Sequence, residues 1–222
     1  GVALALYIDD FLFSFFGPCL IQLDPLQTII FFTITVVLLG DFLTYLIHYL
    51  FHRVPFLWRF HKIHHSATTL NPITQYRIHP VELFINNVRG MFVLSFTSGI
   101  FLYFSTFPIH PLTIYGVNAL SFCFLLYGSN LRHSHVKLTY WNWLENILIS
   151  PFQHQIHHSN NPNHYNKNLG AKLALWDWMF GTLLKSKEVN KVIYGLGDED
   201  GDYNSFLKNL LTPFLLKKRN KQ

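Results

Sequence analysis

Residues 28–50 read TIIFFTITVVLLGDFLTYLIHYL, a stretch whose strongly polar side chains are Asp41 and His48. A helix that crosses the hydrocarbon core of a bilayer needs about 20 mainly apolar residues. The stretch therefore predicts a transmembrane helix, and the rest of the chain is interpreted outward from it.

Three further segments are apolar enough to enter a bilayer. Residues 91–107 and 109–131 contain no Lys, Arg, Asp or Glu and are joined by a short turn at Pro108, which predicts a transmembrane helical hairpin. Residues 2–23 are apolar but are interrupted by two aspartates, and they predict the end of one span followed by a re-entrant or interfacial segment.

The composition agrees with a membrane protein. Charged residues make up 13% of the 222-residue chain, against about 25% in soluble domains. A soluble protein with a large core is the alternative, which the long uncharged hairpin disfavours. Cys19 and Cys123 are too few for a disulfide framework or a cysteine-rich metal site. The net charge is +5, but the basic residues form no stripe, so nucleic acid is not an expected partner.

The positions of the basic residues predict the orientation of the chain. All 17 Lys and Arg residues follow position 52, and none lies between positions 90 and 131. Because Lys and Arg near span ends stay on the cytoplasmic side, both polar segments, before and after the hairpin, are expected on the cytoplasmic face. The basic residues 217–221 are expected to be a solvated end that favours anionic headgroups.

Histidines are grouped within these two polar segments. The first segment holds a pair and a triplet, and the second holds a triplet with the same spacing: His48 and His52; His61, His64 and His65; His154, His157 and His158. Residues three or four apart share one side of a helix, so each group can present two imidazoles to one point. Neutral imidazole is a common ligand of iron, zinc and copper, and eight imidazoles exceed what one ion can use.

A pH switch and a structural zinc site are the alternative roles for these histidines, although structural zinc takes four ligands and favours cysteine. His110 lies in the hairpin turn and is interpreted as a surface residue at headgroup level.

Asp41 and Tyr45 precede His48 and His52 on one helix face, at steps of four, three and four. A carboxylate inside a span is costly unless it is paired or functional. Asp41 is therefore interpreted either as a hydrogen-bond partner of a ligand imidazole or Tyr45, or as a polar residue that faces a neighbouring helix.

The histidine motifs HYLFH (residues 48–52), HKIHHS (61–66) and HQIHHS (154–159) resemble those of the fatty acid hydroxylase and sterol desaturase superfamily of membrane di-iron oxygenases. LWRF at 57–60, RIHPVE at 77–82, NLG at 168–170 and WDWMFGT at 176–182 also resemble family motifs, so the resemblance covers about residues 40–185. It implies one domain over residues 1–222. The implied fold is an all-α membrane bundle of about four spans or re-entrant helices, with a cytoplasmic helical cap that carries a histidine-rich di-metal site.

The resemblance also implies the site residues. The expected ligands of two iron ions per chain are the eight grouped histidines together with His133, which matches an additional family histidine, and His164, which could equally be a loop residue. His135 is interpreted as a non-ligand. Asp41, Tyr45, His79 and Asp177 are expected to support the ligands, and no catalytic residue is expected beyond the ligands. Zinc could replace iron in a purified sample.

The implied reaction is the oxidation of a lipid C–H bond, in a sterol or a fatty acyl chain, by dioxygen and two electrons, giving hydroxylation or desaturation. The electrons are expected from a separate ferredoxin or cytochrome-type protein with an NAD(P)H-dependent reductase. The implied location is a multi-pass membrane protein with a cytoplasmic active site. Two alternatives remain: a zinc-dependent membrane hydrolase, which would act without oxygen, and a non-catalytic metal-binding or lipid-binding membrane protein.

Overall fold

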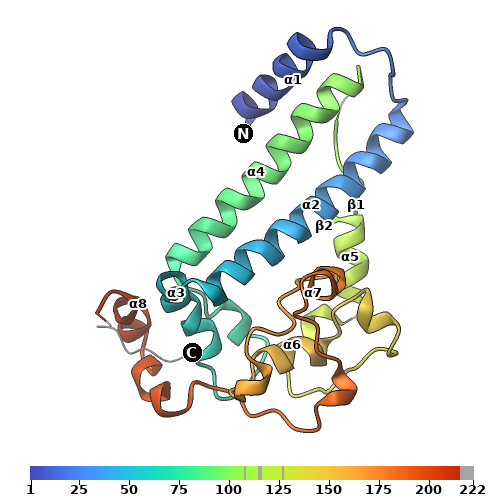
Figure 1. Cartoon of the computed structure of the whole chain (residues 1–222). Coiled ribbons are helices and arrows are strands. Elements are labelled where there is room, and N and C mark those ends of the chain that lie inside the picture. Colours follow the sequence, from blue (N-terminus) through green and yellow to red (C-terminus); the bar gives the residue numbers. More distant parts are fainter. Residues whose placement is uncertain (108, 115–116, 127, 216–222) are drawn as a thin grey trace. The chain divides into compact units, whose positions relative to one another are not determined.

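The computed structural model describes residues 1–107, 109–114, 117–126 and 128–215, which are mainly helical (Figure 1). The α-helices are α1 (Val2–Phe16), α2 (Pro25–Arg53), α3 (Pro55–His65), α4 (Pro80–Phe104), α5 (Ala119–Leu126), α6 (Pro151–His157), α7 (Leu175–Met179) and α8 (Phe206–Leu215). Six short 3₁₀ turns are η1 (Thr74–Tyr76), η2 (Ser129–Leu131), η3 (Leu144–Asn146), η4 (Pro162–His164), η5 (Ser186–Glu188) and η6 (Gly197–Tyr203). The strands β1 (Thr113–Ile114) and β2 (Val117–Asn118) pair antiparallel, Thr113 with Asn118 and Ile114 with Val117.

The chain divides into two compact units. The first contains residues 1–43 and 86–127, and the second contains residues 44–85 and 128–222. The helices α2 and α4 each begin in one unit and end in the other. The turn at Pro108 and the basic residues 217–221, both part of the expectations above, lie outside the described residues.

The helix α2 contains the predicted span and is confirmed as a helix. Among the described helices it is the one long and apolar enough to cross a membrane. Its end is set by the local sequence, because a residue before proline is held out of the helical region. Val54 is extended, with φ −96° and ψ 113°, and Pro55 then begins α3.

The second arm of the predicted hairpin differs from the expectation. Within residues 109–131, the elements of the described residues are the β1–β2 ladder, α5 and the 3₁₀ turn η2. The helix α5, at eight residues, is about 12 Å long and too short to cross a bilayer. The helix begins only at Ala119, because Asn118 caps it: the Asn118 Oδ1 accepts the N–H groups of Leu120 and Ser121. Apolarity suggested a span, but turn and capping residues decide the backbone here.

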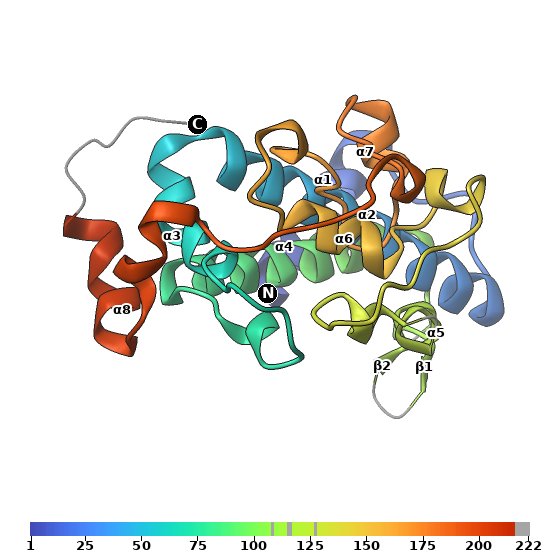
Figure 2. The same ribbon diagram turned by 90° about the horizontal axis from the view of Figure 1, so that it is seen from below.

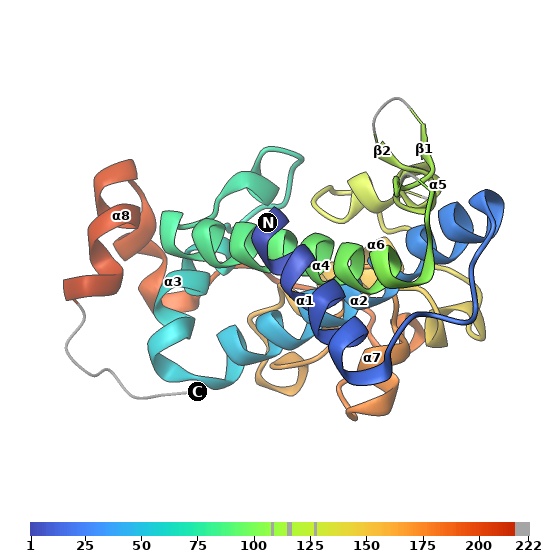
Figure 3. The same cartoon turned by 90° about the horizontal axis from the view of Figure 1, so that it is seen from above.

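In the first unit, α1 and α2 pack against α4 (Figures 1 and 3). The rings of Phe32 on α2 and Phe101 on α4 meet edge to face at 5.4 Å. Gly99 lets α1 approach, because a Cβ there would lie 2.6 Å from the Ala5 oxygen. The buried residue Asp41 also belongs to this unit.

In the second unit, loops hold the short helix α6 in place (Figure 2). Ser150 caps α6 by accepting the Gln153 N–H, and the Gln153 side chain accepts the Ser150 N–H in return. The buried carboxylate of Glu145 accepts the Ser150 hydroxyl at 2.8 Å and the Ser186 N–H at 3.0 Å. These contacts fix the beginning of the helix that carries the second histidine triplet.

Candidate metal centre

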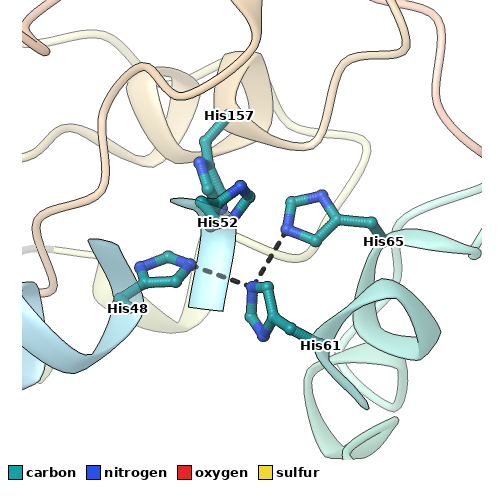
Figure 4. Close-up of side chains that lie close together, drawn as sticks. All are labelled: His48, His52, His61, His65 and His157. Carbon is teal, nitrogen blue, oxygen red and sulfur yellow. Dashed lines mark hydrogen bonds between the residues drawn. The ribbon is translucent and has the colours of Figure 1, made fainter. Parts of the chain in front are cut away.

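Nine of the ten predicted ligands form two groups in the second unit. The first group is His48, His52, His61, His65 and His157, and the second is His64, His133, His154 and His158. Within each group the candidate ligand atoms lie within 4.8 Å of one another. Figure 4 shows the first group, with side chains from α2, α3 and α6 pointing toward one point.

Helix geometry explains how the triplets divide between the groups. In each triplet the first and third histidines are four residues apart and share one side of the helix. His61 and His65 thus enter the first group, and His154 and His158 enter the second. The middle histidine of each triplet, His64 or His157, turns to the other group, so α3 and α6 each supply both groups.

In the first group, protein oxygens hold the Nδ1 atoms of three rings. His48 Nδ1 lies 2.8 Å from the Leu169 oxygen, and His157 Nδ1 lies 2.9 Å from the Lys167 oxygen. Both carbonyls belong to a loop in which Asn166 and Asn168 adopt positive φ values of 57° and 54°, a conformation that asparagine tolerates better than most residues. These two turns place alternate carbonyls toward the histidines.

The third ring held in this way is His61, whose Nδ1 lies 2.9 Å from the buried Glu82 carboxylate. A carbonyl or carboxylate oxygen can only accept, so Nδ1 of each of the three rings carries the hydrogen and Nε2 presents a lone pair.

In the second group, Thr74 fixes His133 in the same way. The Thr74 hydroxyl donates to the Asn71 oxygen at 2.7 Å, so it accepts a hydrogen from His133 Nδ1 at 3.0 Å. The His133 Nε2 lone pair then faces His154 Nε2 at 3.2 Å. This tautomer leaves Nε2 free to bind a metal ion.

The converging lone pairs fit metal ions. His61 Nε2 lies 3.0 Å from His48 Nε2 and 3.1 Å from His65 Nε2, contacts drawn as dashed lines in Figure 4. The Nε2 atoms of His61 and His48 both present lone pairs, which repel each other at this distance unless a cation lies between them. Nitrogens about 2.1 Å from one ion, at a right angle, would lie about 3.0 Å apart. The buried Nε2 atoms of His52 and His157 also have no hydrogen-bond partner among the described residues.

Burial keeps several of the grouped imidazoles neutral. Burial and repulsion by His61 lower the pKa of His157 to about 3. Burial and repulsion by Arg132 lower the pKa of His133 to about 4. Burial likewise lowers the pKa of His65 and His158 well below the usual value. Neutral imidazoles do not have to lose a proton before they bind a metal.

The two groups adjoin, and the first one has an opening. The rings of His65 and His158, one from each group, stack with centroids 4.4 Å apart. A partly open cavity adjoins the first group, and its lining includes His52, His65 and His157 together with the polar side chains Lys62, Ser159, Tyr165, Asn166 and Glu199. Lys62 and Glu199 form an ion pair within this lining. Small polar molecules can therefore reach the first group from this side.

Asp177 and Tyr45 form one network that supports His48. The fully buried Asp177 carboxylate accepts the N–H groups of Leu169 and Gly170, each at 2.7 Å, and the Thr182 hydroxyl at 2.6 Å. Tyr45 Oη lies 3.1 Å from the same hydroxyl. Asp177 thus fixes the loop whose Leu169 carbonyl orients His48.

The other predicted site residues lie elsewhere. His164 is outside both groups, and its Nδ1 lies 2.9 Å from the Ser159 hydroxyl. His79 accepts the Val81 N–H and donates to the Leu210 oxygen of α8 at 3.2 Å, so it fastens α8. In the first unit, Asp41 interacts electrostatically with Arg89 of α4, which donates to the neighbouring Gly40 oxygen. The predicted support of the ligands by Asp41 stays a prediction.

Sequence reasoning missed the role of Glu82. It lies in a motif that the sequence shares with the family, but the sequence does not show that its carboxylate meets His61. Such a partner fixes the ring and makes the other nitrogen a stronger ligand.

We expect Glu82→Gln to weaken metal binding by about 10- to 100-fold, the usual effect of losing such a partner. Competition of the purified protein with a chromophoric chelator measures the change. The control is Asp198→Asn, because Asp198 is an exposed carboxylate of the same unit. Equal affinity in both variants would contradict the role assigned to Glu82.

Comparison with known proteins gives consistent matches. The model of the fatty acid hydroxylase family matches residues 33–182. An alkylglycerol monooxygenase of Xenopus tropicalis is 32% identical over 167 residues, which are 70% of this chain and 31% of that protein. An ornithine lipid hydroxylase of Rhizobium tropici is 28% identical over 181 residues, 82% of this chain and 50% of that protein. A cholesterol 25-hydroxylase of Homo sapiens is 28% identical over 151 residues, which are 66% of this chain and 48% of that protein.

The chain therefore spans about a third of the alkylglycerol monooxygenase and about half of the other two relatives. No solved structure matches it.

Proposed function

Since the chain belongs to the fatty acid hydroxylase family, we propose that it is a membrane oxidoreductase that binds two iron ions and hydroxylates a lipid C–H bond. The observation that carries this proposal is the pair of adjoining groups of imidazoles, with five and four converging ligand atoms. Five donors exceed the four that zinc usually takes and suit an ion of higher coordination number.

Iron, when bound, supplies reductive activation of dioxygen, a chemistry that side chains lack. The reaction balances as RH + O₂ + 2e⁻ + 2H⁺ → ROH + H₂O. The chain holds the ions through the nine grouped histidines, and Glu82, Thr74 and the carbonyls of residues 167 and 169 orient four of the rings. The ligands come from α2, α3, α6 with its cap residue His158, and the loop that carries His133, so a displacement of any of these segments disturbs the centre.

The relatives support hydroxylation over desaturation, because their names describe hydroxylases and monooxygenases that act on an alkylglycerol, an ornithine lipid and cholesterol. Each of these compounds is a lipid that carries a polar group. We therefore propose a membrane lipid as substrate, with electrons from a separate ferredoxin or cytochrome-type protein and its NAD(P)H-dependent reductase.

The proposed location is a multi-pass membrane protein with the metal centre on the cytoplasmic side. The apolar helix α2 supports this, because His48 and His52 lie in its last two turns and Arg53 ends it. Lys and Arg at a span end favour the cytoplasmic face. The ligands of α2 would then lie near the cytoplasmic boundary of the bilayer.

The test is oxygen-dependent lipid oxidation by protein purified without oxygen and loaded with iron. The substrates are an alkylglycerol, an ornithine lipid, a fatty acyl lipid and a sterol, each supplied with a reductase system and ¹⁸O₂. We expect mass spectrometry to find one ¹⁸O atom in the product, and zinc-loaded protein to be inactive. Product formed without oxygen or reductant would contradict the proposal and favour a zinc hydrolase.

A further inference from the structure

We propose that the second unit rests on the bilayer interface through an aromatic surface formed by Trp141, Trp143, Trp178, Met179 and Phe180. This inference rests on the proposed membrane location but not on the proposed reaction. The five side chains are exposed by 72%, 60%, 64%, 56% and 54%, respectively.

Exposed aromatic side chains on this scale indicate a surface that another molecule covers. Large aromatic residues usually bury most of their surface, yet three of the five tryptophans of the chain lie on this surface. The rings of Trp141 and Trp143 are stacked, with centroids 6.2 Å apart and planes at 11°. They thus present a paired apolar area instead of isolated side chains.

Backbone hydrogen bonds join the two segments that carry these residues. The Ala174 N–H, just before α7, donates to the Ile147 oxygen at 2.8 Å, and the Ile149 N–H donates to the Lys172 oxygen at 2.9 Å. The loop with the tryptophan pair is therefore fastened to the segment that leads into α7. Trp178 and Met179 belong to α7, and Phe180 follows it.

Two lysines lie beside the aromatic residues and indicate which kind of surface they contact. Lys185 Nζ donates to the oxygen of Asn142, which lies between the paired tryptophans, and Lys167 Nζ donates to the Gly181 oxygen, next to Phe180. Tryptophan and tyrosine are enriched at the headgroup level of bilayers, and lysine attracts anionic lipids there. Apolar rings beside partly exposed lysines thus fit an anionic membrane surface.

The apolar helix α2 indicates where the aromatic surface lies along the bilayer normal. The Phe180 ring stacks on Tyr45 of α2 with centroids 5.4 Å apart. Residues 26–45 are about 20 residues, or about 30 Å of helix, which matches the hydrocarbon thickness. Tyr45 then marks the boundary of the hydrocarbon, and His48 follows about 4.5 Å further along the axis. A lipid would need to leave the bilayer by only a short distance to reach the first histidine group.

The experiment measures tryptophan fluorescence of the full chain in nanodiscs whose lipids carry bromine at shallow or deep acyl positions. We expect shallow bromines to quench more than deep ones. The triple variant W141F/W143F/W178F should lose most of the shallow quenching, while the matched variant Trp58→Phe keeps it. Metal content of each variant reports whether the fold survives.

A second arm tests the lysines. We expect shallow quenching to increase when phosphatidylglycerol is added to phosphatidylcholine nanodiscs, and the variant K167Q/K185Q to lose that increase. Quenching by water-soluble acrylamide but not by bromine would overturn the inference and indicate a soluble partner. Protection from both quenchers, with a doubled particle mass, would overturn it in favour of a second copy. None of these readouts needs catalysis, so a failure of the proposed reaction is seen separately.

Discussion

Replacing His133 with alanine is expected to remove one metal ion and leave the other. His133 belongs to the group of four, which would keep three imidazoles, whereas the group of five stays complete. Loss of a direct ligand should weaken binding by at least about 100-fold, because even an outer hydrogen-bond partner contributes about 10- to 100-fold. Iron should therefore fall from about two to about one ion per chain.

The reciprocal variant is His157→Ala, which removes a ligand of the first group. Metal analysis and Mössbauer spectroscopy of iron-57-grown protein should show about one iron per chain and no coupled pair in His133→Ala. In His157→Ala the first group keeps four imidazoles, so we expect weaker binding of the first iron and an altered spectrum of the pair. The control is His135→Ala, because His135 is exposed, lies two residues from His133 and belongs to neither group. Two irons per chain in His133→Ala would contradict the assignment of that residue.

The sequence predicts which histidines meet but not how they divide. The spacing of the triplets indicates shared helix faces, and the structure brings nine of the ten predicted ligands together. The transfer of His64 and His157 to the opposite groups depends on how α3 and α6 face each other. The way two helices face each other is part of the tertiary structure, and the local sequence pattern does not predict it.

The supporting residues show the same limit. Asp177 is predicted from its motif, but its effect on His48 passes through the backbone of residues 169 and 170. Glu82 lies in a family motif, but the sequence does not reveal its contact with His61, which lies 21 residues away. His79 matches a family motif, yet it fastens α8 through Leu210.

For the fold, apolarity alone predicts α2 well and residues 109–131 poorly. The interior of α2 contains no proline, and its end follows from Pro55. In residues 109–131, the capping residue Asn118 sets the start of α5 at Ala119. Hydropathy reports the solvent that a segment prefers, whereas turn and capping residues decide its backbone.

Asp177→Asn should lower both the stability of the second unit and the metal content of the first group. Asp177 uses its two carboxylate oxygens to accept two backbone N–H groups and one hydroxyl. An asparagine replaces one oxygen by an NH₂ group, which would face another donor inside a fully buried site. Leaving such donors unpaired, and losing the charge, costs about 3 kcal/mol of the free energy of unfolding.

The loss of metal should be selective, because the loop released by Asp177→Asn carries the carbonyls that orient His48 and His157, both in the first group. Thermal unfolding in detergent and iron analysis measure the two effects, with the exposed Asp198→Asn as control. Thr182→Val removes one donor to this carboxylate and should give a smaller loss of stability, which keeps the prediction testable if Asp177→Asn does not fold. Equal loss of metal from both groups in Thr182→Val would show that the network supports the whole unit and not the His48 side of the centre.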